Sequence, residues 1–203
     1  MRTLVVYKMK TELCQLAQKW TTDKALYYTE FYHSLLKNKR DAKKVLEMGI
    51  GYPCDYMRYS MNQMDCKEYK TGASIYMWQE YFPEAQIYAL DNIREILINE
   101  GRIKSFYCDQ ADESTYPLNE LGIDFDLIVE DGLHIKEYQI KAADVLVSLL
   151  APGGIYIMED IGYLTPLERR ELQGELCFDS ELKEFGDKLE AAVIVIRRSD
   201  ERT

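Results

Sequence analysis

The chain has 203 residues, 47% of them hydrophobic and 12% aromatic, which is enough to bury the core of one compact domain. A formal charge of −10 argues against a nucleic-acid partner and against an anionic membrane surface, because phosphates are contacted mainly by Lys and Arg. No apolar stretch has transmembrane length, and residues 4–7 are too short for a signal-peptide core. Five cysteines without Cys-x-x-Cys spacing favour reduced thiols in a cytoplasmic protein over a zinc site.

Residues 1–42 are predicted to form a helical cover packed on a sheet. Apolar residues recur at helical spacing over residues 11–20 and again over residues 27–36, and Asp23 is expected to cap the second helix. A polar, mostly basic connector follows. The tyrosine-rich second helix is a candidate wall for an acceptor pocket, together with the loop at residues 52–70 described next.

Residues 43–203 alternate short apolar runs with helical patterns, which predicts an α/β fold with one doubly wound, mostly parallel sheet. Strands are expected at residues 45–48, 86–91, 103–107, 125–129 and 154–158, with a last strand at 191–196 that pairs antiparallel at or near an edge. Helices are expected at residues 74–82, 138–149 and 167–173. Residues 52–70 break the pattern and read as an inserted loop. The whole chain is therefore predicted to be a single domain.

The first strand leads into a turn that contains Gly49 and Gly51 and begins at Glu47. Small residues there let a backbone approach a ligand closely, although many tight turns also contain Gly-x-Gly. The third glycine of a dinucleotide fingerprint is replaced by Cys54. Asp91 ends the next strand, where an acid either accepts hydrogen bonds from ribose hydroxyls or caps a following helix, here predicted over residues 93–100.

Two later strands each end in two adjacent acids, Glu130 with Asp131 and Glu159 with Asp160. His134, one of two histidines in the chain, follows the first pair. Such acids often cap the next helix. However, the carboxyl ends of parallel strands meet at one edge, so these groups are expected to lie together. S-adenosylmethionine, with a positive sulfonium and no phosphate, suits an acidic pocket that lacks a phosphate-binding loop.

The chain resembles class I S-adenosylmethionine-dependent methyltransferases in its glycine turn, Asp91 and the Pro-Gly-Gly at residues 152–154. More narrowly, it is similar to the macrocin O-methyltransferase family over about residues 20–160. The matching segments are residues 22–24, 71–78, 81–83, 109–112, 125–134, 152–157 and 159–160.

The resemblance implies a Rossmann-like methyltransferase fold whose seventh strand is antiparallel. It also implies O-methylation of a hydroxyl on a sugar, glycoside or related small molecule, assisted by a divalent metal, typically magnesium. When the roles of the family's residues are transferred to this sequence, Asp131 and Asp160 become metal-ligand candidates, with Glu159 as a third, and His134 becomes the general base. Asp131 is thus expected both to bind the metal and to act as a catalytic residue. A small-molecule or glycan acceptor is the expected partner, and a homo-oligomer is compatible with the sequence.

For the methyl donor, the resemblance assigns Glu47 and the glycine turn to the amino-acid end and Asp91 to the ribose. Asp109 and Gln110 are assigned to the adenine edge. The family's usual Asp-Asp-Gly-Ser-His reads Glu-Asp-Gly-Leu-His at residues 130–134, a departure that bears on efficiency or substrate choice. Two alternatives remain open: an NAD(P)-binding oxidoreductase, and a methyltransferase-fold binding module without catalysis.

Overall fold

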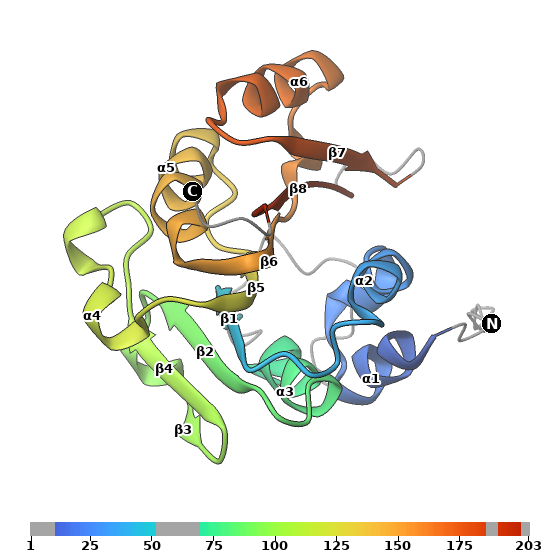
Figure 1. Ribbon diagram of the computed structural model, residues 1–203, viewed down its shortest axis with the longest axis vertical. Helices are drawn as coiled ribbons and strands as arrows, with labels where there is room; N and C mark the ends of the chain where they lie inside the picture. The colour runs from blue at the N-terminus through green and yellow to red at the C-terminus, as the bar shows by residue number, and fades with distance from the viewer. Residues whose placement is uncertain (1–10, 52–69, 186–190, 200–203) are drawn as a thin grey trace, which may run out of the picture.

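The computed structural model describes residues 11–51, 70–185 and 191–199, and it confirms the predicted α/β fold (Figure 1). Within these residues, eight strands form one sheet in the order β3-β4-β2-β1-β5-β6-β8-β7. The strands are β1 (Lys44–Met48), β2 (Gln86–Asp91), β3 (Asn99–Glu100), β4 (Ile103–Tyr107), β5 (Phe125–Glu130), β6 (Leu150–Met158), β7 (Ser180–Glu184) and β8 (Ala192–Arg197).

The central strands β4, β2, β1, β5 and β6 run parallel, while β3, β8 and β7 are antiparallel to their neighbours. From β1 the chain builds outward through β2 and β4, and it then returns to place β5 on the other side of β1. The strand order therefore reverses between β1 and β5. In open α/β sheets, ligands bind beyond the carboxyl ends of the strands at this switch point.

The last strand is antiparallel, as predicted, and it lies second from the edge between β6 and β7. The outermost strand, β7, has the sequence Ser-Glu-Leu-Lys-Glu and is mostly exposed, so it lacks the apolar run by which a strand is recognised. The two-residue β3 brings the strand number to eight rather than the seven that the resemblance implied.

Helices cover both faces of the sheet, with α1, α2 and α3 on one side and α4 and α5 on the other (Figure 1). The α-helices are α1 (Glu12–Trp20), α2 (Thr29–Leu36), α3 (Ala73–Tyr81), α4 (Leu118–Leu121), α5 (Lys136–Leu146) and α6 (Pro166–Glu175). The 3-10 helices are η1 (Asp23–Leu26), η2 (Arg94–Ile96), η3 (Glu113–Thr115), η4 (Val147–Leu149) and η5 (Ile161–Tyr163).

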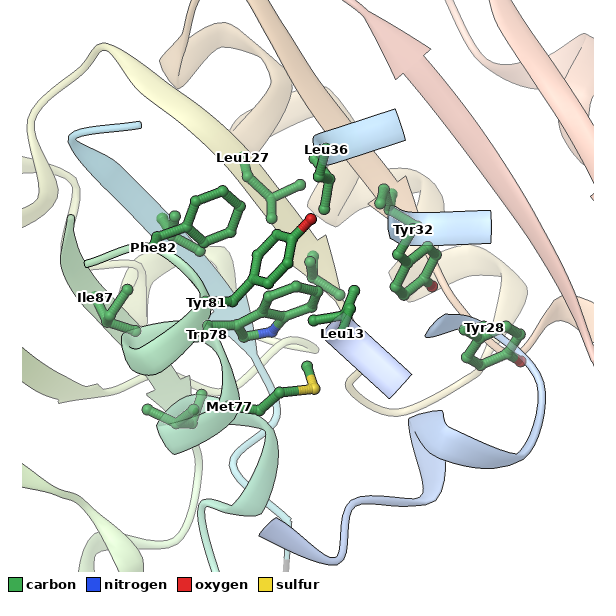
Figure 2. Close-up of a cluster of buried hydrophobic side chains, with 14 of the residues drawn as sticks. Leu13, Tyr28, Tyr32, Leu36, Met77, Trp78, Tyr81, Phe82, Ile87 and Leu127 are labelled. Carbon is green, nitrogen blue, oxygen red and sulfur yellow. The ribbon is translucent and has the colours of Figure 1, made fainter. Parts of the chain in front are cut away.

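Two apolar clusters lie on the two faces of the sheet. Trp78, Tyr81 and Phe82 lie with side chains of α1 and α2 against Leu127 of β5 in the first cluster, and Tyr28 lies at its margin (Figure 2). The second cluster joins α5 and α6 to the opposite faces of the same strands. The strand residues alternate between the clusters, which is the period-two pattern of a sheet buried on both sides.

The prediction of a helix over residues 93–100 is wrong. Only the short η2 forms there, because Ile93 and Leu97 have extended backbones and the chain turns back to pair as β3 with β4. The Ser105 hydroxyl donates to the Ile98 carbonyl and accepts from its N–H, so these groups are not available to a helix. A polar edge strand thus replaces the helix.

Two smaller predictions also fail. Asp23 does not cap the second helix, because α2 begins after Tyr28, which makes no side-chain cap hydrogen bond. Asp23 is instead the first residue of η1, which Thr22 caps by accepting from the Lys24 N–H. The strand predicted at residues 154–158 begins earlier, at Leu150, so the Pro-Gly-Gly at residues 152–154 lies inside β6, beside an irregularity in its pairing with β5.

The loop predicted at residues 52–70 lies, except for Lys70, outside the described residues, as do Cys54 and Cys66. Cys14, Cys108 and Cys177 are free thiols. Among the described helices, none combines the length and the apolar character needed to cross a bilayer.

Candidate active site

Three neighbouring strands bring carboxylates to one edge of the sheet at the switch point. Glu47 lies in β1, while Asp131 and Glu159 directly follow β5 and β6. Side chains alternate between the faces of a strand, so Glu47 shares the face of Val45 and Glu159 that of Ile157. Both apolar residues belong to the cluster under the N-terminal helices. The three carboxylates therefore face the N-terminal cover, residues 11–36.

Lys24 of η1 is the cation that these carboxylates surround, and it is only 1% exposed. Its Nζ lies 2.6 Å from Asp131 Oδ2 and 2.6 Å from Glu159 Oε2. Glu47 Oε1 lies 3.2 Å from the same nitrogen. Burial by itself would lower the pKa of Lys24, but attraction to Asp131, Glu159 and Glu47 raises it well above its usual value. Lys24 is therefore charged.

One ammonium does not balance the acids around it. Burial raises the pKa of Glu47 to about 7, against the attraction of Lys24. Burial also raises the pKa of Glu159, with Asp131 and Asp160 adding to the effect. This edge of the sheet therefore takes up a proton or a cation more readily than isolated carboxylates would.

Asp131, His134 and Asp160 form a second group on the outer side of Asp131. One donor atom from each lies within 4.8 Å of the others. His134 Nε2 lies 3.7 Å from Asp131 Oδ1 and 3.6 Å from Asp160 Oδ2. The His134 side chain is 34% exposed, so a ligand can reach the group.

His134 and Asp160 both have left-handed backbones, with φ of 49° and 53°. Residues other than glycine rarely adopt this conformation, and where it occurs it is often part of a functional site. Here the side chains of the two residues lie close together, with His134 Nε2 3.6 Å from Asp160 Oδ2. His134 Nδ1 is buried and has no hydrogen-bond partner among the described residues.

Asp160 is also hydrogen-bonded by a residue of the N-terminal cover. The Tyr28 hydroxyl donates a short hydrogen bond to Asp160 Oδ1, which leaves Oδ2 on the side of His134. Burial and the charge of Asp131 raise the pKa of Asp160 to about 6, while His134 opposes the shift.

The donor set fits a divalent cation. Carboxylate oxygens of Asp131 and Asp160 converge from the turns after β5 and β6, with His134 beside them, and hard divalent ions accept such oxygen ligands. The excess of acids over Lys24 supplies the charge that a cation would balance. Asp131 and Asp160, both predicted as metal ligands, are thus brought together.

Glu159 lies apart from this group. Its Oε2 accepts from Lys24 at 2.6 Å and its Oε1 accepts from the Tyr32 hydroxyl at 2.8 Å. Both oxygens are therefore engaged by the cover, and the role of Glu159 as a third metal ligand stays a prediction.

The glycine turn is held by the protein itself. Gly49 has a φ of 95°, and a Cβ there would come within 2.0 Å of the Asp131 carbonyl oxygen. Gly49 is thus required by the close approach of the chain after β5. Asp91, predicted to bind ribose, accepts from the Ile50 N–H at 2.9 Å and from the Ile93 N–H at 3.0 Å, and so fixes this turn. Gly51 also has a positive φ, of 84°.

Gln110 links two strand ends. Its Nε2 donates to Glu130 Oε1 at 2.8 Å, and its Oε1 accepts from the Leu133 N–H at 2.7 Å. Asp109, its neighbour, accepts from the Ala111 N–H in a local turn. Glu130, which departs from the family pattern, is buried, and burial raises its pKa. Leu133, the other departure, is 41% exposed.

Sequence reasoning missed the contribution of Lys24, Tyr28 and Tyr32. Residues 22–24 belong to the resemblance, and the tyrosine-rich helix is a candidate wall for an acceptor pocket, but nothing in the spacing indicates that a lysine is buried among three carboxylates. The excess of acids over bases at the strand ends is the signal that could have prompted a search for a buried cation.

No protein-family model matches the chain. It is 29% identical over 157 residues to mycinamicin VI 2''-O-methyltransferase of Micromonospora griseorubida, an alignment that covers 75% of this chain and 36% of that protein. It is 30% identical over 159 residues to demethylmacrocin O-methyltransferase of Streptomyces fradiae, covering 75% and 37%. The chain thus spans little more than a third of the length of these curated relatives.

A solved structure of the MycE methyltransferase of mycinamycin biosynthesis, in complex with Mg and SAH, has the same fold. It superposes with a TM-score of 0.69 at 23% identity, covering 95% of this chain and 56% of that one. The mostly parallel sheet with N-terminal helices is therefore a sheet of the methyltransferase type.

Proposed function

We propose that this relative of the macrocin and mycinamicin O-methyltransferases transfers the methyl group of S-adenosylmethionine to a hydroxyl of a sugar, glycoside or related small molecule. The observation that carries the proposal is the convergence of Asp131, His134 and Asp160 at the switch point, beside the glycine turn. The net charge of −10 supports a small-molecule acceptor in preference to nucleic acid, and we expect a cytoplasmic enzyme.

The donor would occupy the carboxyl ends of β1 and β2. We assign its amino-acid end to Gly49, Gly51 and Glu47 and its ribose to Asp91, whose carboxylate lies at the end of β2. We assign the adenine edge to the segment of Asp109 and Gln110 after β4. In support of this arrangement, these residues follow three adjacent strands in the order in which the donor's parts are joined.

His134 is the group that we propose to accept the hydroxyl proton, at Nε2. Asp131 and Asp160 lie on either side of that nitrogen and would stabilise the imidazolium that forms. The methyl group passes in line from sulfur to oxygen, so the protein's main task is to hold the two reactants collinear. Asp131 and Asp160, with His134 close by, would hold a divalent cation, and a hydroxyl beside such a cation is more acidic.

Calorimetry with S-adenosylmethionine tests the proposal directly, with NADH as the comparison ligand for the oxidoreductase alternative. We expect the methyl donor and its demethylated product to bind and NADH not to bind. Methyl transfer would then be assayed on a panel of glycosides with magnesium and with chelator. Binding of NADH without binding of the methyl donor would reject the proposal.

A further inference from the structure

The two aspartates of the candidate cation site share one arrangement. In each carboxylate, one oxygen faces His134 and the other is bonded by a residue of the N-terminal cover. We propose that Lys24 and Tyr28 are positioning residues that aim Asp131 and Asp160 at the cation, so that cation binding and docking of the cover are thermodynamically linked. This inference rests on the proposed function, because it concerns the same site.

Lys24 holds Asp131 through Oδ2 at 2.6 Å, while Asp131 Oδ1 lies on the side of His134. Releasing the carboxylate would be costly for Lys24, because its ammonium is buried away from the solvent that could replace the lost partner. Its second bond, to Glu159 Oε2 at 2.6 Å, fixes the ammonium between β5 and β6. The orientation of Asp131 is thus determined by a residue more than one hundred positions earlier in the chain.

Tyr28 holds Asp160 in the same way through Oδ1. Its ring is held independently of the hydroxyl, stacked on Tyr32 at 5.6 Å and edge-on to Phe185 at 5.4 Å. Replacing Tyr28 by phenylalanine therefore removes the bond to Asp160 and preserves the ring contacts. Partners that orient a ligand in this way typically contribute about 10- to 100-fold in metal affinity.

Linkage makes the effect reciprocal. If the docked cover strengthens cation binding, a bound cation must strengthen docking of the cover by the same factor. Both aspartates are bonded by residues 24 and 28, so the response is expected in η1 and α2 rather than in α6, which lies away from these bonds.

The test uses Mn²⁺ as the probe, with Tyr28→Phe in the full chain, because this substitution removes one hydrogen bond to Asp160 and leaves the charge of the site unchanged. Tyr81→Phe is the matched control, since it removes a buried tyrosine hydroxyl of the same apolar cluster that is bonded to His33 instead. We expect Tyr28→Phe to weaken Mn²⁺ binding about tenfold and Tyr81→Phe to leave it unchanged. S-adenosylmethionine affinity should stay the same in Tyr28→Phe and Tyr81→Phe.

Hydrogen exchange supplies the second readout. In the unsubstituted chain, Mn²⁺ should slow amide exchange over residues 23–36, and Tyr28→Phe should lose most of that protection. If the Mn²⁺ affinity of Tyr28→Phe is within twofold of that of the unsubstituted chain, or if Mn²⁺ does not alter exchange over residues 23–36, the inference is overturned. The proposed function would still stand if the unsubstituted chain bound the methyl donor. Lack of donor binding by the unsubstituted chain would instead reject the proposed function.

Discussion

In the glycine turn after β1, Asp91 of β2 bonds the protein's own backbone, whereas beyond β5 and β6 the side chains of Asp131, His134 and Asp160 converge without His134 hydrogen-bonding either aspartate. Asp91 accepts from two backbone N–H groups, at 2.9 and 3.0 Å. His134 Nε2, in contrast, lies 3.6 and 3.7 Å from two carboxylate oxygens, outside hydrogen-bond range. The first region is a preformed scaffold, while the second is a set of donors that a ligand would complete.

The difference shows that, along one edge of the sheet, some polar groups maintain the structure and others are available to bind a ligand. A scaffold held by its own hydrogen bonds keeps its shape without ligand, and substitutions in it should affect stability. A convergent set of unbalanced acids tends to bind protons or cations, and substitutions in it should affect binding and turnover. The predictions below test this division.

The largest expected effect is on turnover in His134→Ala. We expect methyl transfer to fall by about 10²- to 10⁴-fold, because a positioned base contributes that much. Affinity for S-adenosylmethionine should be unchanged, as measured by calorimetry on the same preparation. Turnover close to that of the unsubstituted chain would remove His134 from the role of base, and loss of Mn²⁺ binding in this variant would make it a metal ligand.

Asp131→Asn should weaken Mn²⁺ binding and turnover together by about 10- to 100-fold, because a neutral amide of the same shape replaces a charged ligand. The comparison variant for Mn²⁺ affinity is Asp109→Asn, which changes an acid that follows β4, on the far side of β2 from β1 and outside the cluster. A titration that shows equal Mn²⁺ affinity in both variants would contradict the assignment of Asp131.

Gly49→Ala should cost about 3 kcal/mol of unfolding free energy, since the Cβ would come within 2.0 Å of a backbone oxygen at a positive φ. Gly174→Ala in α6 is the control, since a Cβ there meets no atom within 4 Å. It should be neutral or stabilising by up to about 1 kcal/mol. Urea denaturation of the two variants measures the difference, and similar stabilities would show that the turn is not constrained.

The smallest effect is on the pH dependence of stability without divalent cation. The folded protein holds protons on Glu47 and Asp160 more tightly than the unfolded chain, because their pKa values are raised to about 7 and about 6. This contribution is fully present only below the unfolded pKa values of 3.8 and 4.5 and is lost as the pH rises from there through the folded values of about 6 and about 7, so unfolding free energy should fall by on the order of 2 kcal/mol. Glu47→Gln should flatten the dependence, and stability that rises over this range would contradict it.

Most of the strands could be predicted, since apolar runs bounded by turns are a strong local signal for a buried parallel sheet. The failures lie where local and tertiary signals conflict. Residues 93–100 have helical spacing, but the hydrogen bonds with Ser105 and the pairing with β4 draw them into an edge strand. The strand β7 has no apolar run because it lies at the edge and faces solvent.

The candidate site, too, has features that the sequence predicts and features that depend on tertiary packing. The acids at the ends of β5 and β6 were expected to lie together, and Asp131, His134 and Asp160 do so. The engagement of Glu159 by Lys24 and Tyr32 was not foreseeable, because it depends on how the cover docks.

The sequence by itself determined the parallel sheet, the glycine turn and the gathering of acids at one edge, because each follows from short-range patterns and from the common direction of parallel strands. Only the tertiary structure decided which oxygens face His134 and which face Lys24 and Tyr28. That choice depends on side chains far apart in the chain, whose approach no local periodicity encodes.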